Sequence, residues 1–120
     1  GTANYPGAIG LAASLRLINS LGQQRVAEHI HALTAHLIAG LRALGFTLVT
    51  DFDRAHRAGI VAFTADSPQQ NLALMESLLE QRILVSVRYT SGVGGIRVSC
   101  HFFNSLADVD RLLSALASLR

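Results

Sequence analysis

The fold is constrained most by a strand pattern near the end of the sequence that is followed, after a few residues, by a helix pattern. Residues Ile96 to Cys100 alternate between apolar and polar side chains, as a strand with one buried face does. Ser105, with Asp108 three residues later, matches a capping box, which begins a helix. The pattern therefore predicts a half-buried strand followed by a final capped helix, with Arg97 inside the strand.

The chemistry of Arg97 allows two interpretations. A guanidinium keeps its proton, and its fork of donors matches the two oxygens of a carboxylate. An arginine held on a rigid strand beside a turn is therefore suited to binding an anionic ligand. A surface arginine whose head group is only solvated fits the same spacing, so the pattern alone leaves both interpretations open.

The first part of the sequence predicts an unusually apolar helix. Asn4 can cap it, and Pro6 is tolerated in a first helical turn. From Gly7 to Leu21 the side chains are apolar nearly all the way round, whereas about 100° of a helix normally faces its own core. The surplus predicts contact with a missing domain or a partner subunit, and a central helix wrapped by this domain is the alternative.

A second helix is expected from Gln23, after a break at Gly22, and Gly45 follows its end. Its apolar stripe comprises Val26, Ile30, Leu33, Leu37, Leu41 and Leu44. Three histidines lie on this helix: His29, His31 and His36. The first two point to nearly opposite sides, and the outer two are two turns, roughly 10 Å, apart. No metal site is therefore expected.

The remaining elements alternate between strands and helices. Strands are predicted at Phe46 to Thr50, Gly59 to Thr64 and Ile83 to Val87, and Tyr89 to Gly95 is predicted as a hairpin loop. A helix is expected after Ser67 as N-cap and Pro68 as first residue, with Leu72, Met75, Leu78 and Leu79 on its inward face. The final helix buries Leu106, Val109, Leu112, Leu113, Leu116 and Leu119. The strand–helix–strand run from Gly59 to Val87 should form a right-handed parallel crossover.

The fold class expected from these elements is α+β, in one domain of residues 1–120. Two N-terminal helices precede a β-β-α-β-β-α run, and a small mixed sheet is covered by helices on one face. The length fits a single domain.

Two segments resemble the small C-terminal domain of class V aminotransferases. This group of fold-type-I enzymes uses pyridoxal phosphate (PLP) and includes cysteine desulfurases, kynureninases and isopenicillin N epimerase-like proteins. The segment Gly94 to Asn104, with the Asp-x-Asp-Arg-Leu helix after it, resembles the family's closing segment. The segment Gly1 to Leu11 resembles its Gly-Thr-x-Asn entry. The resemblance covers essentially the whole chain and implies that residues 1–21 form a connecting helix toward a large domain.

The resemblance also implies roles for individual residues. Arg97 matches the arginine that binds the α-carboxylate of an amino-acid substrate. Thr2 matches the residue that reaches the cofactor phosphate of the neighbouring subunit in a homodimer, and a hydroxyl near a helix N-terminus suits phosphate. Arg88 is a further candidate for substrate binding and Asn4 for cofactor binding. No catalytic residue and no metal ligand is expected in the chain.

The absence of lysine limits what the chain can do alone. The chain has ten arginines and no lysine. PLP enzymes of this group hold the cofactor as a Schiff base on a lysine. The chain should therefore be inactive by itself, with PLP bound in the complete enzyme and none attached covalently here.

The reaction stays open among transamination, epimerisation, lyase and hydrolase chemistry. Cysteine desulfurases resemble the chain but carry a nucleophilic cysteine in the loop before the last strand. The corresponding residues, Tyr89 to Gly95, contain none, which disfavours desulfuration. Cys100 is expected to be a small buried hydrophobe, and His101 and Asn104 are expected to have structural roles.

Composition excludes several other functions. A net charge of +2, without clustered arginines, disfavours nucleic-acid binding. No apolar run reaches the ~18 residues that span a bilayer, and the single cysteine suits a reducing compartment, so a cytoplasmic location is expected. The alternative function is a non-enzymatic ligand-sensing or dimerisation module with a ferredoxin-like sheet. The Gly-Thr-x-Asn start favours the enzyme domain.

Overall fold

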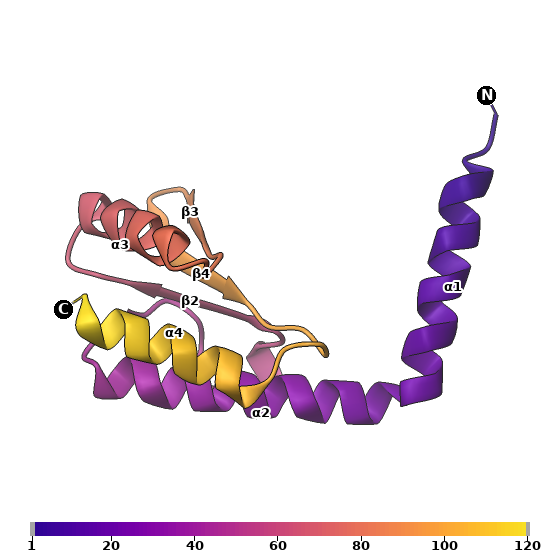
Figure 1. Cartoon of the computed structure of the whole chain (residues 1–120), viewed down its shortest axis with the longest axis horizontal. Coiled ribbons are helices and arrows are strands. Elements are labelled where there is room, and N and C mark those ends of the chain that lie inside the picture. Colours follow the sequence, from indigo (N-terminus) through magenta and orange to yellow (C-terminus); the bar gives the residue numbers. More distant parts are fainter. Residues whose placement is uncertain (1, 120) are drawn as a thin grey trace.

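The computed structural model describes residues 2–119 of the chain. Figure 1 shows the arrangement of the helices and strands, and in chain order the elements are α1 (Tyr5–Leu21), α2 (Gln23–Ala43), β1 (Thr47–Leu48), the 3-10 turn η1 (Arg54–His56), β2 (Ile60–Thr64), α3 (Pro68–Glu80), β3 (Ser86–Thr90), β4 (Val93–Ser99) and α4 (Leu106–Ser118). The predicted α+β class and the predicted order of elements are confirmed.

The sheet is antiparallel throughout, whereas the predicted sheet is mixed. Its strand order is β1-β2-β4-β3, and each of the three neighbouring pairs is antiparallel. Strands β2 and β3, which α3 connects, run in the same direction, but β4 lies between them. The crossover therefore exists without a parallel pair, because the chain turns back after β3 and inserts β4 next to β2.

The hairpin between β3 and β4 is tighter than predicted. Its turn is only Ser91-Gly92, with φ angles of 51° and 79°, and Thr90 pairs with Val93 across it. Positive φ at both central residues is what a type I′ turn requires, and that turn matches the twist of the flanking strands. Most of the predicted loop is therefore strand, and β3 begins at Ser86, three residues later than the predicted strand.

One face of the sheet forms the core. Val61, Phe63 and Ile96 are fully buried there against the inward side chains of three helices. These helical side chains form a single cluster with the strands and come from α2 (Leu33, Leu37, Leu41), α3 (Leu78) and α4 (Val109, Leu112, Leu116). The predicted cover of helices on one face is confirmed, and the opposite face is left open.

The inward faces of two helices differ in part from the predicted ones. In α3 the buried residues are Asn71 and Leu78, whereas Leu72 is 47% exposed and Leu79 is 56% exposed. In α4 both ends of the predicted stripe are exposed, Leu106 at 52% and Leu119 at 36%. Helical spacing alone does not show how a helix is rotated on a sheet, because the strands opposite it select the face.

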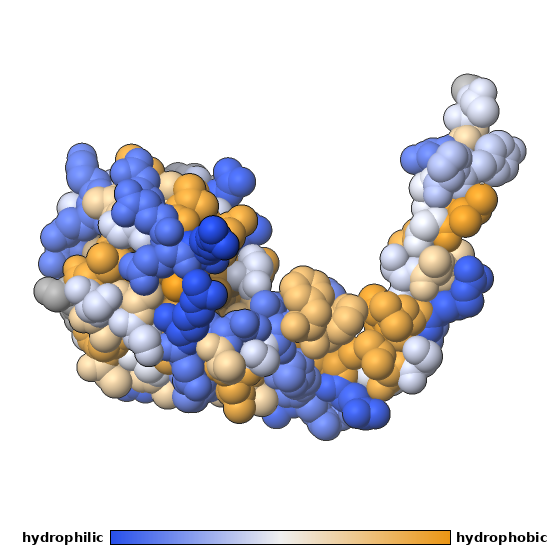
Figure 2. Space-filling view, viewed as in Figure 1, coloured by the Kyte–Doolittle hydropathy of each residue, from blue (hydrophilic) through white to orange (hydrophobic). Residues whose placement is uncertain are grey.

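Helix α1 is an arm that leaves the rest of the molecule. Gly22, with φ of 88°, ends it and redirects the chain, and no residue of α1 is buried. Figure 1 shows the arm pointing away from the sheet, and Figure 2 shows apolar side chains along it. Ile9 is 69% and Leu11 61% exposed. No helix in residues 2–119 is both long and apolar enough to cross a membrane.

The capping box of α4 makes one prediction about pH. The Ser105 N–H donates to Asp108 Oδ2 at 2.8 Å, and the Asp108 N–H donates to Ser105 Oγ at 3.3 Å. Hydrogen bonds from the Ser105 backbone, and then from its side chain, lower the pKa of Asp108 below its ordinary value of 3.8. Since the folded-state pKa is the lower one, the stabilisation is present above 3.8 and is lost as the pH falls through the folded-state value.

Asp108→Asn should therefore flatten the fall in the free energy of unfolding below about pH 5, measured by urea unfolding at several pH values. Asp66→Asn, at an exposed position outside the box, is the control. An unchanged acid slope in Asp108→Asn would contradict this role of the carboxylate.

Candidate anion-binding site

Arg97 lies on the open face of the sheet, between two paired strands. Its neighbours in register are Ala62 on β2 and Ser86 on β3. The side chain is exposed, and no hydrogen bond or ion pair joins its guanidinium to another residue of the described range 2–119. The backbone of Arg97 is therefore held from both sides while its head group is uncommitted.

Arg88 lies on the same face, one strand away. It pairs with Gly95, two positions before Arg97, so the two arginines are diagonal neighbours whose Cα atoms are about 7–8 Å apart. Its side chain is also exposed and has no acid partner among the residues described. Two uncommitted guanidinium groups on one rigid surface are suited to an anion, since like charges so close favour a bound counter-charge.

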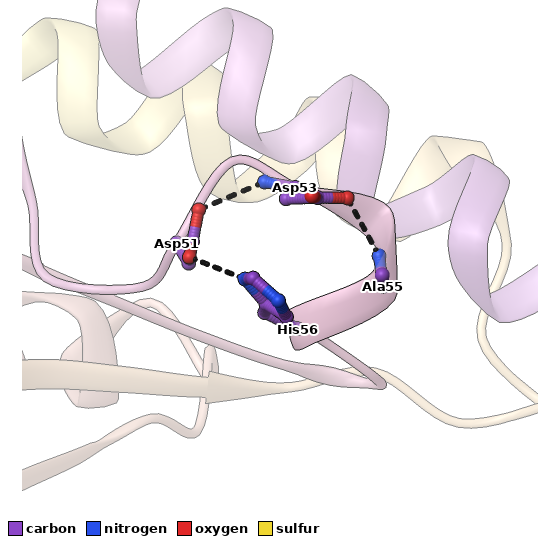
Figure 3. A network of polar contacts seen from close by, with 4 residues as sticks. All are labelled: Asp51, Asp53, Ala55 and His56. Atoms are coloured by element: carbon purple, nitrogen blue, oxygen red, sulfur yellow. Dashed lines mark hydrogen bonds and ion pairs between the residues drawn. The ribbon is translucent and has the colours of Figure 1, made fainter.

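The ion pairs in the described part of the chain involve histidines and lie elsewhere. His36 Nε2 is 2.6 Å from Asp110 Oδ1. In the loop drawn in Figure 3, His56 Nδ1 is 2.8 Å from Asp51 Oδ2, and Asp51 Oδ1 accepts the Asp53 N–H at 2.9 Å. The backbone bond from Asp53, followed by the contact with His56, lowers the pKa of Asp51. The His36 contact joins α2 to α4, and the Asp51 contacts organise a surface loop, so neither arginine is neutralised by them.

The two candidate cofactor residues lie apart from the arginines. Asn4 caps α1, and its Oδ1 accepts the Gly7 N–H at 3.0 Å. Thr2 precedes the helix and is exposed. Figure 1 places this end of the chain at the free end of the arm, away from the sheet. One copy of the chain therefore brings Arg88 and Arg97 together but does not bring Thr2 and Asn4 to them.

Cys100 is part of the core, as predicted. It is 8% exposed, and burial raises the pKa of its thiol. A raised pKa disfavours the thiolate, which is the nucleophilic form. The structural role predicted for Asn104 is also confirmed, because its Oδ1 accepts the His101 N–H at 2.9 Å in the turn before α4.

His29 and His36 of α2 contact the C-terminal part of the chain instead of each other. His29 Nε2 lies 2.8 Å from the carbonyl oxygen of Asn104. Within residues 2–119 no group of three or more histidine, cysteine, aspartate or glutamate side chains could hold a metal ion.

The helical pattern missed the polar residue Asn71, which is fully buried on α3. Its Oδ1 accepts the Ala65 N–H at 2.8 Å, and its Nδ2 donates to Thr64 Oγ1 at 2.8 Å and to the Tyr89 hydroxyl at 2.7 Å. The available signal was its spacing, since Asn71 lies three and seven residues before Leu74 and Leu78, which both pack in the core. A polar side chain in that stripe must find partners inside the protein.

The described chain thus forms a small antiparallel sheet with helices on one face and, on the other, two strand arginines that have no acid partner among residues 2–119. The chain belongs to the aminotransferase class-V family, whose model matches residues 1–112. This membership confirms the resemblance and favours an enzyme domain over a ligand-sensing or dimerisation module.

Individual relatives agree with the family. A probable cysteine desulfurase from Pyrococcus abyssi (strain GE5 / Orsay) is 28% identical over 128 residues, covering 99% of this chain and 32% of the relative. The apo structure of a cysteine desulfurase from Thermococcus onnurineus NA1 is 29% identical with a TM-score of 0.88, covering 99% of this chain and 32% of that one.

A third relative is the cystine C-S lyase C-DES, solved in complex with its reaction product cysteine persulfide. It is 32% identical with a TM-score of 0.80, and the match covers 98% of this chain and 30% of that one. A variant of C-DES carries glycine covalently linked to its PLP cofactor. The chain thus spans about a third of the length of these relatives.

Proposed function

We propose that the chain is the small C-terminal domain of a PLP-dependent enzyme that acts on an amino-acid substrate, with Arg97 binding the substrate's α-carboxylate. The observation that carries this proposal is the position of Arg97 on the open face, held by strands on both sides and free of any acid partner in the described range. Family membership supports it. A guanidinium so placed can bind both carboxylate oxygens at once and orient the substrate.

Arg88 supplies a second guanidinium at the same site. It lies on the same face as Arg97 and is also uncommitted. It raises the local positive potential and so increases the affinity for an anionic substrate.

The cofactor is held mainly by the rest of the enzyme in this proposal. PLP supplies an electron sink for carbanion chemistry, and its covalent attachment needs a lysine, which the chain lacks. Thr2 contributes a hydroxyl to the cofactor phosphate of a second subunit across a homodimer. Asn4 fits this role only through its Nδ2 group, because its Oδ1 is used in capping α1.

The reaction we propose is not desulfuration, although two of the relatives are described as cysteine desulfurases. The Ser91-Gly92 turn and the strand residues beside it contain no cysteine. Cys100 cannot replace the missing nucleophile, because it is buried in the core with a raised pKa.

The proposal that PLP attaches covalently only to the rest of the enzyme can be tested with the purified chain and PLP. When the purified chain is mixed with PLP and reduced with borohydride, we expect no adduct on any side chain, since no lysine is present. Peptide mapping by mass spectrometry would locate an adduct, and the N-terminal amine serves as the internal control. A reduced Schiff base on an interior residue would contradict the proposal.

The arm makes a prediction about assembly. Its apolar side chains are exposed, and exposed apolar patches mark interaction surfaces. We expect the chain to self-associate through α1, and Leu11→Glu should weaken association at least about tenfold in sedimentation equilibrium. Leu84→Glu changes a leucine that is 81% exposed outside α1 and should leave association unchanged. A strictly monomeric wild-type chain at high concentration would contradict this role of α1.

A further inference from the structure

We propose that Asn71 is a positioning residue, which fixes the outer part of the β3–β4 hairpin through Tyr89 and thereby sets the place of Arg88 relative to Arg97. The part of this inference that concerns ligand binding rests on the proposed function. The part that concerns the hairpin rests on the geometry alone.

The register of the sheet shows why the two arginines are held differently. Strand β2 pairs with β4 only as far as Phe63 and Ile96. Arg97 lies inside this region and has a paired strand on each side. Arg88 lies on the edge strand β3, which pairs with β4 alone, and its partner Gly95 lies beyond the last β2–β4 pair. The position of Arg97 is therefore set by the sheet, and that of Arg88 depends on the hairpin.

The hairpin has few side chains that could hold it. Gly92 lies in its turn, and Gly94 and Gly95 lie opposite Tyr89 and Arg88. Tyr89 is the exception, because its hydroxyl accepts a hydrogen bond from Asn71 Nδ2 at 2.7 Å. This is the side-chain hydrogen bond that joins residues 88–95 to the remainder of the described chain.

Asn71 is well suited to anchor another residue because its own orientation is determined. It is fully buried, its Oδ1 accepts the Ala65 N–H, and its second Nδ2 hydrogen is donated to Thr64 Oγ1. An amide that donates twice and accepts once cannot rotate without leaving buried groups unpaired. Asn71 thus links the end of β2 and the helix α3 to the hairpin.

Amide hydrogen exchange on the 120-residue chain tests this link. Tyr89→Phe keeps the ring and removes only the hydroxyl, so the chain should stay folded. We expect amide exchange at hairpin residues 88–95 to become about five- to tenfold faster, as the loss of one hydrogen bond predicts, while the amides of the central β2–β4 pairs keep their rates. Tyr5→Phe, which removes a hydroxyl from the exposed arm, is the matched control and should change neither set.

Two results would overturn the inference. Unchanged exchange in the hairpin would show that the hydrogen bond does not hold it, and equal acceleration of all slow amides would show a general structural role.

A titration with L-alanine, followed through the Nε–Hε signals of Arg88 and Arg97, tests the link to the ligand. In Tyr89→Phe the change of the Arg88 signal on adding L-alanine should be at least twofold smaller than in the wild type, while the change of the Arg97 signal is retained. An Arg88 signal change equal to that of the wild type would overturn the positioning role. If neither signal responds in the wild type, the proposed carboxylate site is wrong, whereas the exchange result still decides the role of Asn71 in the hairpin.

Discussion

Replacing Gly95 with alanine is expected to lower the free energy of unfolding by about 2–4 kcal/mol. A Cβ at this position would lie 2.2 Å from the carbonyl oxygen of Phe63 and 3.0 Å from Thr64 Cβ. The backbone has φ of 158°, where side chains other than that of glycine are rarely found. The obstructing oxygen belongs to the neighbouring strand, so no rotamer change can relieve the contact and β2 must separate from β4.

Urea unfolding followed by circular dichroism would measure this loss. Gly10→Ala is the control, because an added Cβ there meets nothing within 4 Å. It should be neutral or stabilise helix α1 by up to about 1 kcal/mol. If Gly95→Ala were as stable as the wild type, the register that brings Phe63 opposite Ile96 would be contradicted.

In the complete enzyme, Arg97→Lys is expected to weaken binding of the amino-acid substrate by about 1.5–3 kcal/mol, roughly a tenfold to hundredfold loss of affinity. Lysine keeps the positive charge but loses the planar fork that binds two carboxylate oxygens. The measurement is the substrate dissociation constant, or KM where binding is fast. Arg54→Lys, at an exposed position in η1, is the matched control and should leave the affinity unchanged.

Stability separates this role from a structural one. The head group of Arg97 is exposed and makes no hydrogen bond or ion pair with residues 2–119, so Arg97→Ala should change the stability of the 120-residue chain by less than about 0.5 kcal/mol. The opposite pattern, a destabilised chain with unchanged substrate affinity in the complete enzyme, would remove the reason for assigning Arg97 to the site.

The helix ends can be predicted from the sequence because they depend on local hydrogen bonds. Asn4, Ser67 and Ser105 were predicted to cap helices, and each accepts a backbone N–H at the start of α1, α3 or α4. The breaks at Gly22 and Gly45 were also predicted, and both have positive φ. These features involve residues three or four positions apart, so the information that specifies them is contiguous in the chain.

The sequence predicts the candidate site only in part. The motifs near both ends led to the family and to Arg97, and the alternation from Ile96 to Cys100 placed this arginine in a strand. The sequence does not give the position of Arg97 relative to Arg88, because its pattern predicts a loop over residues 89–95, whereas the turn is only the two residues Ser91-Gly92. Whether Thr2 and Asn4 meet the site of a second subunit stays a prediction.

By itself the sequence determined the helix boundaries, the α+β class, the family and the absence of the lysine that PLP attachment needs. Only the tertiary structure decided that β4 lies between β2 and β3, that α3 turns Asn71 inward, and that Arg97 is held on both sides while Arg88 is held on one. The physical reason is the range of the interactions. Caps and turns are satisfied by neighbours in the chain, whereas strand order and helix rotation are selected by contacts between segments far apart in sequence, whose patterns fit several arrangements until they pack together.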